Sequence, residues 1–247
     1  MKLPQRASRF LSRYSDRNPL PLRGGQGVVS FTFDDAPMSA CVAGAAALEA
    51  FGVRGTWYIA GGLTDGVEEG IACHSAAALR DLLAAGHQLG AHSFTHVHMD
   101  RLDAARRREQ LDRSGEFLAA LGVDLRTLDF AYPFGGVNVG AKRDAAGRYR
   151  SSRATGGGTQ VGSADLNALR THRFYRDEPD GVPYADRLAV AAREGGWLVV
   201  NTHDVQDSPG PVGCTPAALA LAVEQALDAG CRVLTVGAAI DYWAIQS

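Results

Sequence analysis

Long apolar runs are missing from this 247-residue sequence. No segment approaches the roughly 20 consecutive apolar residues needed to span a bilayer, so we expect no transmembrane helix. The N-terminal segment 1–25 is studded with arginine and has no apolar stretch of the signal-peptide kind, which predicts a cytoplasmic protein. Only four cysteines are present and none forms a Cys-x-x-Cys pair, so buried reduced thiols are expected rather than a disulfide framework.

An excess of charge of one sign is also missing. The formal net charge is −2, which gives no general attraction to nucleic acid, and we expect no nucleic-acid partner. Lysine is nearly absent, since only Lys2 and Lys142 occur. The run Gly156-Gly157-Gly158 lacks the spacing of a phosphate-binding loop and predicts a turn. What remains is the composition of a globular protein, 46% hydrophobic and 21% charged, with enough apolar residues for a sizeable core.

Segments typical of strands and helices alternate along the chain, which favours parallel strands joined by helical crossovers. We expect one α/β domain over residues 27–247, preceded by a basic N-terminal arm over residues 1–26. Seven or so such units in one chain predict a barrel, in which the loops after the strands surround the active site. The expected strands are 28–33, 54–60, 88–91, 125–132, 153–155, 171–174, 198–201 and 232–236, and the expected helices are 39–51, 75–85, 101–121, 184–194 and 216–229.

Residues that can do chemistry follow three of these strands. Asp34 and Asp35 end the first one, and His203 ends the apolar strand over 198–201. His92 and His96 follow the strand over 88–91, four residues apart, which is about one helical turn. That spacing predicts that both imidazoles project from one helical face and can share a metal ion.

At these residues the chain resembles the polysaccharide deacetylase family, also called the NodB-homology or carbohydrate esterase family 4 group. The matching motifs are Thr32-Phe33-Asp34-Asp35, His92-Ser93-Phe94-Thr95-His96 behind Gly86-His87-Gln88-Leu89-Gly90, and Asn201-Thr202-His203. The resemblance spans roughly residues 27–236. It implies a distorted (β/α)7 barrel of the NodB-homology type in a single domain. It also implies a divalent metal, usually zinc with cobalt or nickel as options, and hydrolysis of an N-acyl group on an amino sugar.

The chemistry of amide hydrolysis assigns a role to each of these residues. Two imidazoles and a carboxylate hold a metal with positions left open, so Asp35, His92 and His96 are the expected ligands. Asp34 is then the expected general base on the attacking water, and His203 the expected acid that protonates the leaving amine. The backbone N–H of Phe134, beside the rigid Pro133, is a candidate donor to the oxyanion.

The third family motif is altered here. It reads Ala131-Tyr132-Pro133-Phe134-Gly135, without the arginine that would orient the base, and Arg173 is the candidate that replaces it. Asn201 stands where the family usually has a leucine in the acetyl pocket. Tyr132, Phe134 and Asn201 are therefore the expected substrate-side wall. His74 and His98 are not expected to be ligands, and His87 is expected to bond the backbone behind the site.

The function that fits these features is removal of an N-acyl group, first of all N-acetyl, from an amino sugar or glycan precursor. A nucleotide-linked or lipid-carrier-linked precursor suits a chain without an export signal. Two alternatives stay open: a related amidohydrolase such as a deformylase or cyclic-amide hydrolase, and a non-catalytic carbohydrate-binding homologue. The basic arm either wraps the barrel or contacts a phosphate of the substrate, and the oligomeric state is left open.

Overall fold

Seven parallel strands form a closed barrel in the computed structural model, which describes residues 4–68, 70–177 and 180–246. The last strand of the barrel pairs with the first along six residues and closes the ring. This confirms the expected distorted (β/α)7 barrel in a single domain. In order around the barrel the strands are β2 (Val28–Asp34), β3 (Thr56–Ile59), β6 (Gln88–Ala91), β7 (Asp129–Ala131), β8 (Ser151–Gly157), β10 (Leu169–Arg173) and β11 (Trp197–Thr202).

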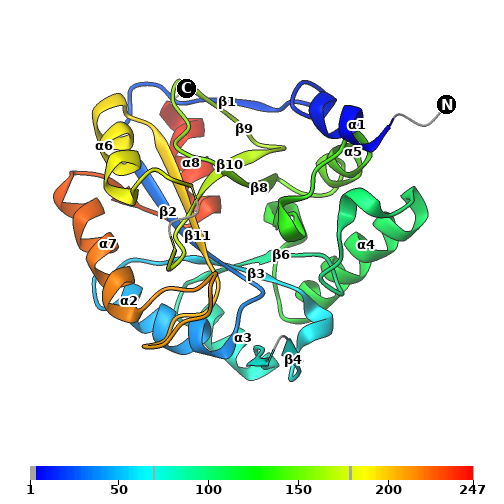
Figure 1. Ribbon diagram of the computed structural model, residues 1–247, viewed down its shortest axis with the longest axis horizontal. Coiled ribbons are helices and arrows are strands. Elements are labelled where there is room, and N and C mark those ends of the chain that lie inside the picture. The colour runs from blue at the N-terminus through cyan, green and yellow to red at the C-terminus, as the bar shows by residue number, and fades with distance from the viewer. Residues whose placement is uncertain (1–3, 69, 178–179, 247) are drawn as a thin grey trace.

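Helices surround these strands, as Figure 1 shows. Three of the helices begin at polar residues that favour a helix start. The side chains of Ser75, Asp103 and Thr215 each accept a hydrogen bond from a backbone N–H in the first turn of the helix that follows. No helix among the described residues is long and apolar enough to cross a membrane. The helices are α1 (Gln5–Leu11), α2 (Ala45–Glu49) after a π-helical turn (Ala40–Gly44), α3 (Ala76–Ala84), α4 (Ala104–Ala120), α5 (Val139–Ala146), α6 (Tyr184–Glu194), α7 (Pro216–Asp228) and α8 (Val236–Gln246).

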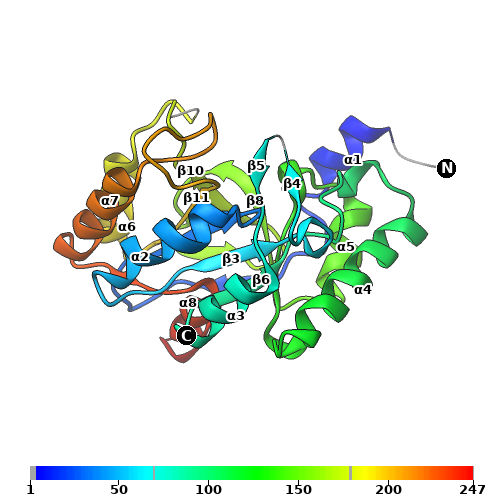
Figure 2. The same cartoon turned by 90° about the horizontal axis from the view of Figure 1, so that it is seen from below.

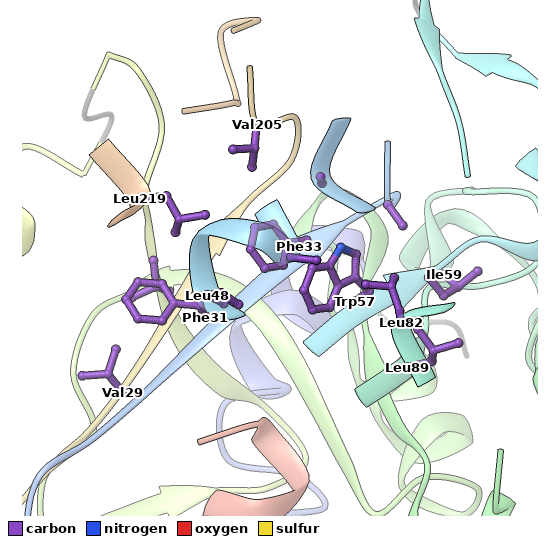
Figure 3. Close-up of a cluster of buried hydrophobic side chains, with 14 of the residues drawn as sticks. Val29, Phe31, Phe33, Leu48, Trp57, Ile59, Leu82, Leu89, Val205 and Leu219 are labelled. Carbon is purple, nitrogen blue, oxygen red and sulfur yellow. The ribbon is translucent and has the colours of Figure 1, made fainter. Parts of the chain in front are cut away.

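Strand β2 shows how the alternation of side chains positions the site. Val29, Phe31 and Phe33 point outward and pack under the helices with Leu48 and Trp57, as drawn in Figure 3. The Phe33 and Trp57 rings are stacked with centroids 4.4 Å apart. Because successive strand residues face opposite sides, the intervening positions of β2 face the interior of the barrel. Asp34, the last of them, therefore points inward at the carboxyl end of the strand.

The opposite end of the barrel is closed by α8. Its Trp243 packs with Val28 and Trp197 in a second apolar cluster. Figure 2 shows α8 at one end of the barrel and the small hairpin of β4 (Val67–Glu68) and β5 (Ile71–Ala72) at the other. Because α8 covers the end where the strands begin, the active site is expected at the other end, where the strands finish.

The N-terminal arm is packed against the barrel. Its short strand β1 (Pro19–Pro21) pairs with β9 (Ser163–Asp165), and α1 contacts α5. The buried Lys142 ammonium donates a hydrogen bond to the backbone oxygen of Ser12 at 3.0 Å. The arm is thus a fixed part of the structure over its described residues.

Several sequence expectations need correction. The strand expected over 232–236 is only two residues long, β12 (Arg232–Val233), and it pairs with the first residues of β2. The strand expected over 125–132 shrinks to β7 because Leu125–Thr127 forms a 3-10 turn. The sequence patterns also do not predict the helices α1, α5 and α8. In α8 the apolar residues are too continuous to show a helical period.

Candidate active site

The expected chemical residues meet at the carboxyl end of the barrel. Strands β2 and β11 are paired in register, with Phe33 opposite Thr202, so Asp34 and His203 leave neighbouring strands at the same level. A cavity of about 350 Å³ opens there. Its lining includes all five residues expected to bind the metal or transfer protons: Asp34, Asp35, His92, His96 and His203.

Asp35, His92 and His96 converge on one point. Their ligand atoms all lie within 4.8 Å of one another. The Nε2 atoms of His92 and His96 lie 3.5 Å and 3.1 Å from Asp35 Oδ1. Both Nδ1 atoms are already occupied, in His92 by the backbone oxygen of Ala131 at 2.8 Å and in His96 by Glu68 at 2.9 Å. The two Nε2 lone pairs therefore face the carboxylate.

These three side chains fit a metal ion. Asp35 Oδ1 is buried and has no hydrogen-bond partner among the described residues, because the nearby Nε2 atoms do not have hydrogen-bond geometry toward it. Burial lowers the pKa of His92 to about 3, so its imidazole is neutral at pH 7 and free to act as a ligand. Burial also raises the pKa of Asp35 to about 6, although the nearby His96 and His203 oppose this rise.

The two histidines are brought together by a turn and not by a helix, which corrects the expected helical face. Residues 92–98 form no helix, and Ser93 and His96 have positive φ angles of 57° and 49°. Their rings are stacked with centroids 5.2 Å apart. Asp35 and Phe134 also adopt positive φ, at 60° and 58°. Strained non-glycine backbone of this kind concentrates at functional sites.

Arg153 is the arginine that contacts Asp34, which corrects the expectation for Arg173. The Arg153 guanidinium donates a short hydrogen bond to Asp34 and lies over the Tyr58 ring, 4.7 Å from its centroid. Arg173 instead binds Asp180 at 2.6 Å. Burial alone would raise the pKa of Asp34, but the charge and hydrogen bond of Arg153, together with the nearby His92 and His203, outweigh it and the pKa falls from 3.8 to about 2. Asp34 is therefore ionised at neutral pH.

His203 faces this group from the far side of the cavity. Its Nε2 lies 3.8 Å from Asp35 Oδ2, and the Tyr175 ring packs edge-on against its imidazole with centroids 5.5 Å apart. Asn201 lies behind Tyr175, fully buried, and its amide donates to the Tyr175 hydroxyl at 3.0 Å. Asn201 is thus outside the cavity wall where it was expected, and Tyr175 takes that place.

Of the other expected wall residues, Phe134 lines the cavity and Tyr132 does not. Tyr132 is buried, with its ring packed against Phe130. The Phe134 ring lies against His96 and stacks on His98 at centroid distances of 4.5 Å and 4.0 Å. His98 is therefore held by an aromatic contact outside the metal cluster, as expected.

The remaining histidines also behave as structural groups. His87 Nδ1 accepts the backbone N–H of Gly55 at 3.1 Å, in line with its expected backbone role. His74 Nδ1 donates to the backbone oxygen of Asp35 at 3.1 Å, which helps to fix the strained residue that carries the carboxylate.

Comparison with protein-family models shows to which family this chain belongs. The model of the polysaccharide deacetylase family matches residues 22–148, just over half of the sequence. The chain belongs to this family. A comparison of the sequence with curated proteins found no match.

Solved structures of such deacetylases and esterases share the fold at low sequence identity. The chitin deacetylase of Colletotrichum lindemuthianum is 19% identical over 86% of this chain and 87% of its own, with a TM-score of 0.56. The family 4 acetyl xylan esterase of Clostridium thermocellum, solved with cobalt, is 21% identical over 85% and 88%, with a TM-score of 0.55. A carbohydrate esterase family 4 pseudoenzyme of Bacillus anthracis is 17% identical over 87% and 66%, with a TM-score of 0.59.

Three residues of this deacetylase-family site were missed by the sequence reasoning. Arg153 stands in an expected strand, and a lone charged residue in a buried strand is a signal for an inward-facing partner. Glu68 lies in a stretch without periodicity, where nothing in the sequence points to the cavity. Tyr175 directly follows the expected strand over 171–174, and that position at the end of a strand is the signal that could have found it.

Proposed function

We propose that this chain is a metal-dependent hydrolase that removes an N-acyl group, first of all N-acetyl, from an amino sugar or glycan precursor. Membership in the polysaccharide deacetylase family supports the reaction class. The observation that carries the proposal is the convergence of Asp35, His92 and His96 beside an ionised Asp34, with His203 opposite. A non-catalytic homologue would have no need of this complete set.

Asp35, His92 and His96 would hold the ion, and zinc suits a site of two imidazoles and a carboxylate, with cobalt or nickel as options. When bound, the ion polarises the acyl carbonyl and lowers the pKa of a water molecule. Glu68 keeps the His96 ring in place and fixes its proton on Nδ1 by accepting a hydrogen bond there. The backbone oxygen of Ala131 does the same for His92.

Asp34 is the proposed general base. Its carboxylate stays ionised because Arg153 contacts it, and it lies in the cavity beside the ligand cluster, where it can accept the proton of the attacking water. His203 is the proposed acid, since it faces the same space from β11 and can deliver a proton to the departing amine. Phe134 and Tyr175 form the proposed wall around the acyl group, with the Phe134 backbone N–H as the oxyanion donor.

An acyl-release assay tests the proposal. Metal-loaded protein is incubated with N-acetylglucosamine oligomers and with N-acetylated and N-formylated amino-sugar phosphates, and released acetate and formate are measured. We expect acetate release. The Asp34→Asn variant should retain its metal and lose activity by about 10²- to 10⁴-fold, whereas Glu49→Gln, a change outside the cavity, should retain activity. Formate release alone would support the deformylase alternative, and equal activity in Asp34→Asn would remove Asp34 as the base.

A further inference from the structure

A second and larger cleft opens beside the catalytic cavity. It has a volume of about 900 Å³ and shares two wall residues, Phe134 and Thr155, with that cavity. The N-terminal arm forms one wall, and Gly135 and Gly136 together with Gly156 and Gly157 form another. Gly156 and Gly157 end β8, so the turn expected at these two residues is a strand end instead. None of the proposed metal ligands or proton-transfer residues lines it. A group placed in this cleft is therefore next to the reacting group without taking part in the chemistry.

Arginine dominates the lining of this cleft. Five arginines line it, from the arm and from both sides of the barrel mouth: Arg9, Arg13, Arg17, Arg101 and Arg170. One carboxylate, Asp165, lines it as well, and Asp165 is already bound by the buried Lys142 at 2.7 Å. We call this space the arginine cleft.

Three of these arginines have no acidic partner. Arg9 is paired with Asp100 at 2.6 Å, and Arg17 lies 4.0 Å from Asp165. For Arg13, Arg101 and Arg170 no carboxylate lies within 4.0 Å among residues 4–68, 70–177 and 180–246. The positive charges of these three arginines are therefore not neutralised by protein carboxylates. A ligand with a single negative charge would neutralise them only in part.

The arginines on the arm are held in place by anchors. The backbone oxygen of Ser12, next to Arg13, accepts the buried Lys142 ammonium at 3.0 Å. The backbone oxygen of Asp16, next to Arg17, accepts the Asn167 amide at 2.7 Å. Because the backbone is held at Ser12 and at Asp16, Arg13 and Arg17 are kept at the cleft. Less conformational entropy of the arm is then lost when an anion binds.

We propose that the arginine cleft binds a phosphate or diphosphate ester of the sugar whose N-acyl group lies in the adjoining cavity. This inference rests on the proposed function and narrows its substrate class to phosphate-linked acylated amino sugars, as opposed to neutral polymers. Guanidinium groups offer paired N–H donors that match phosphate oxygens, and several together match a group with more than one negative charge. The volume of the cleft also exceeds what one phosphate fills, leaving room for a diphosphate and part of the group attached to it.

The phosphate can come from a nucleoside diphosphate or from a lipid carrier. Both present the same diphosphate to the same arginines, so the structure assigns the shared chemistry. The arm that carries Arg13 also exposes Phe10 and Tyr14, which are 56% and 68% accessible and are the kind of residues that contact a lipid chain. The two sources are therefore separated by experiment.

Direct binding of inorganic pyrophosphate tests the cleft without reference to catalysis. Calorimetric titration uses the metal-free full-length protein, so that the anion cannot bind an ion in the active site. Arg13→Gln and Arg170→Gln should each weaken binding about tenfold, and added salt should weaken it further. Arg108→Gln, which removes an exposed charge on α4 outside the cleft, should leave binding unchanged. Binding that is absent, or equally strong in all the variants, would overturn the proposal.

Kinetics then separate the cleft from the reaction itself. UDP-N-acetylglucosamine, a polyprenyl-diphosphate N-acetylglucosamine in micelles and the neutral trimer of N-acetylglucosamine are compared as substrates. We expect a lower KM for one of the two diphosphates, and Arg13→Gln should raise that KM about tenfold with little change in kcat. Arginine-dependent pyrophosphate binding without any hydrolysis would contradict the proposed function but not the cleft. Hydrolysis with equal KM values in Arg13→Gln and Arg108→Gln would overturn the cleft but not the function.

Discussion

Replacing Arg153 by methionine should destabilise the protein through the carboxylate that it leaves behind. Arg153 is fully buried and Asp34 is 3% exposed, so water cannot replace the lost guanidinium. Removing one partner of such a buried pair typically costs about 3–5 kcal/mol. The pKa of Asp34, now about 2, should rise because the burial that raises it would no longer be opposed by Arg153.

The size of the pH effect follows from that pKa. The pKa of Asp34 is lowered to about 2 in the folded protein from an ordinary value of 3.8, a difference that corresponds to roughly 2 kcal/mol of stability. For a lowered carboxylate pKa the stabilisation is present above 3.8 and is lost as the pH falls toward 2. In Arg153→Met the pKa of Asp34 is raised instead of lowered. Lowering the pH toward 4 should then protonate Asp34 and reduce the loss of stability that the substitution causes.

Urea unfolding of metal-free protein at pH 7 and pH 4 measures these effects. The double variant Arg153→Met/Asp34→Asn removes both charges and should recover most of the stability lost by Arg153→Met alone. Arg173→Met is the matched control, because the Arg173 side chain in its pair with Asp180 is 36% exposed and water can reach the site it leaves, so it should cost clearly less than Arg153→Met. Equal losses in Arg153→Met and Arg173→Met, or no recovery in the double variant, would refute the reasoning.

Three further changes probe the ligand support and the barrel. Glu68→Gln weakens the bond to His96 Nδ1 and should lower metal affinity about tenfold in a chelator competition, with unfolding unchanged. Asp129 is buried, accepts hydrogen bonds from Gln88 and Ser151, and has its pKa raised from 3.8 to about 6, so in urea unfolding the effect of Asp129→Asn should be more favourable at pH 8 than at pH 4 by about 3 kcal/mol, whatever the lost hydrogen bonds cost. In Gly90→Ala the new methyl group would lie 2.6 Å from the Tyr58 ring, so urea unfolding should show a loss of about 2 kcal/mol.

Each of these three predictions would be contradicted by a specific outcome. Unchanged metal affinity in Glu68→Gln would mean that His96 needs no support at Nδ1. A pH-independent effect of Asp129→Asn would mean that this carboxyl does not titrate abnormally. Wild-type stability in Gly90→Ala would mean that the Tyr58 ring moves aside without cost.

The sequence predicts the parts of the site that depend on where strands end. Asp34, Asp35, His92 and His203 all follow buried strands, and parallel strands finish at one end of a barrel. The alternation in β2 also separates the inward Asp34 from the outward Phe33, because side-chain direction in a strand has a period of two.

The sequence does not predict contacts that depend on loops or on register between distant strands. Arg153 and Arg173 both stand on strands near the site, and only the placement of β8 relative to β2 decides which of them reaches Asp34. The spacing of His92 and His96 fits a helix as well as the observed turn, since the positive φ of His96 has no signature in the residue types. Asn201 shows the same limit, because its side chain is covered by Tyr175, to which it donates a hydrogen bond, and does not line the cavity.

The cytoplasmic location, the metal that is used and the roles of the individual site residues stay predictions of this account. The choice of metal and the roles of the site residues both depend on one claim, that Asp35, His92 and His96 share an ion. The test is the metal content of purified, extensively dialysed protein, measured by elemental analysis in the wild type, in His92→Ala and in the control His98→Ala. The account predicts about one ion per chain in the wild type and in His98→Ala and almost none in His92→Ala. Equal metal content in His92→Ala and the wild type would contradict it.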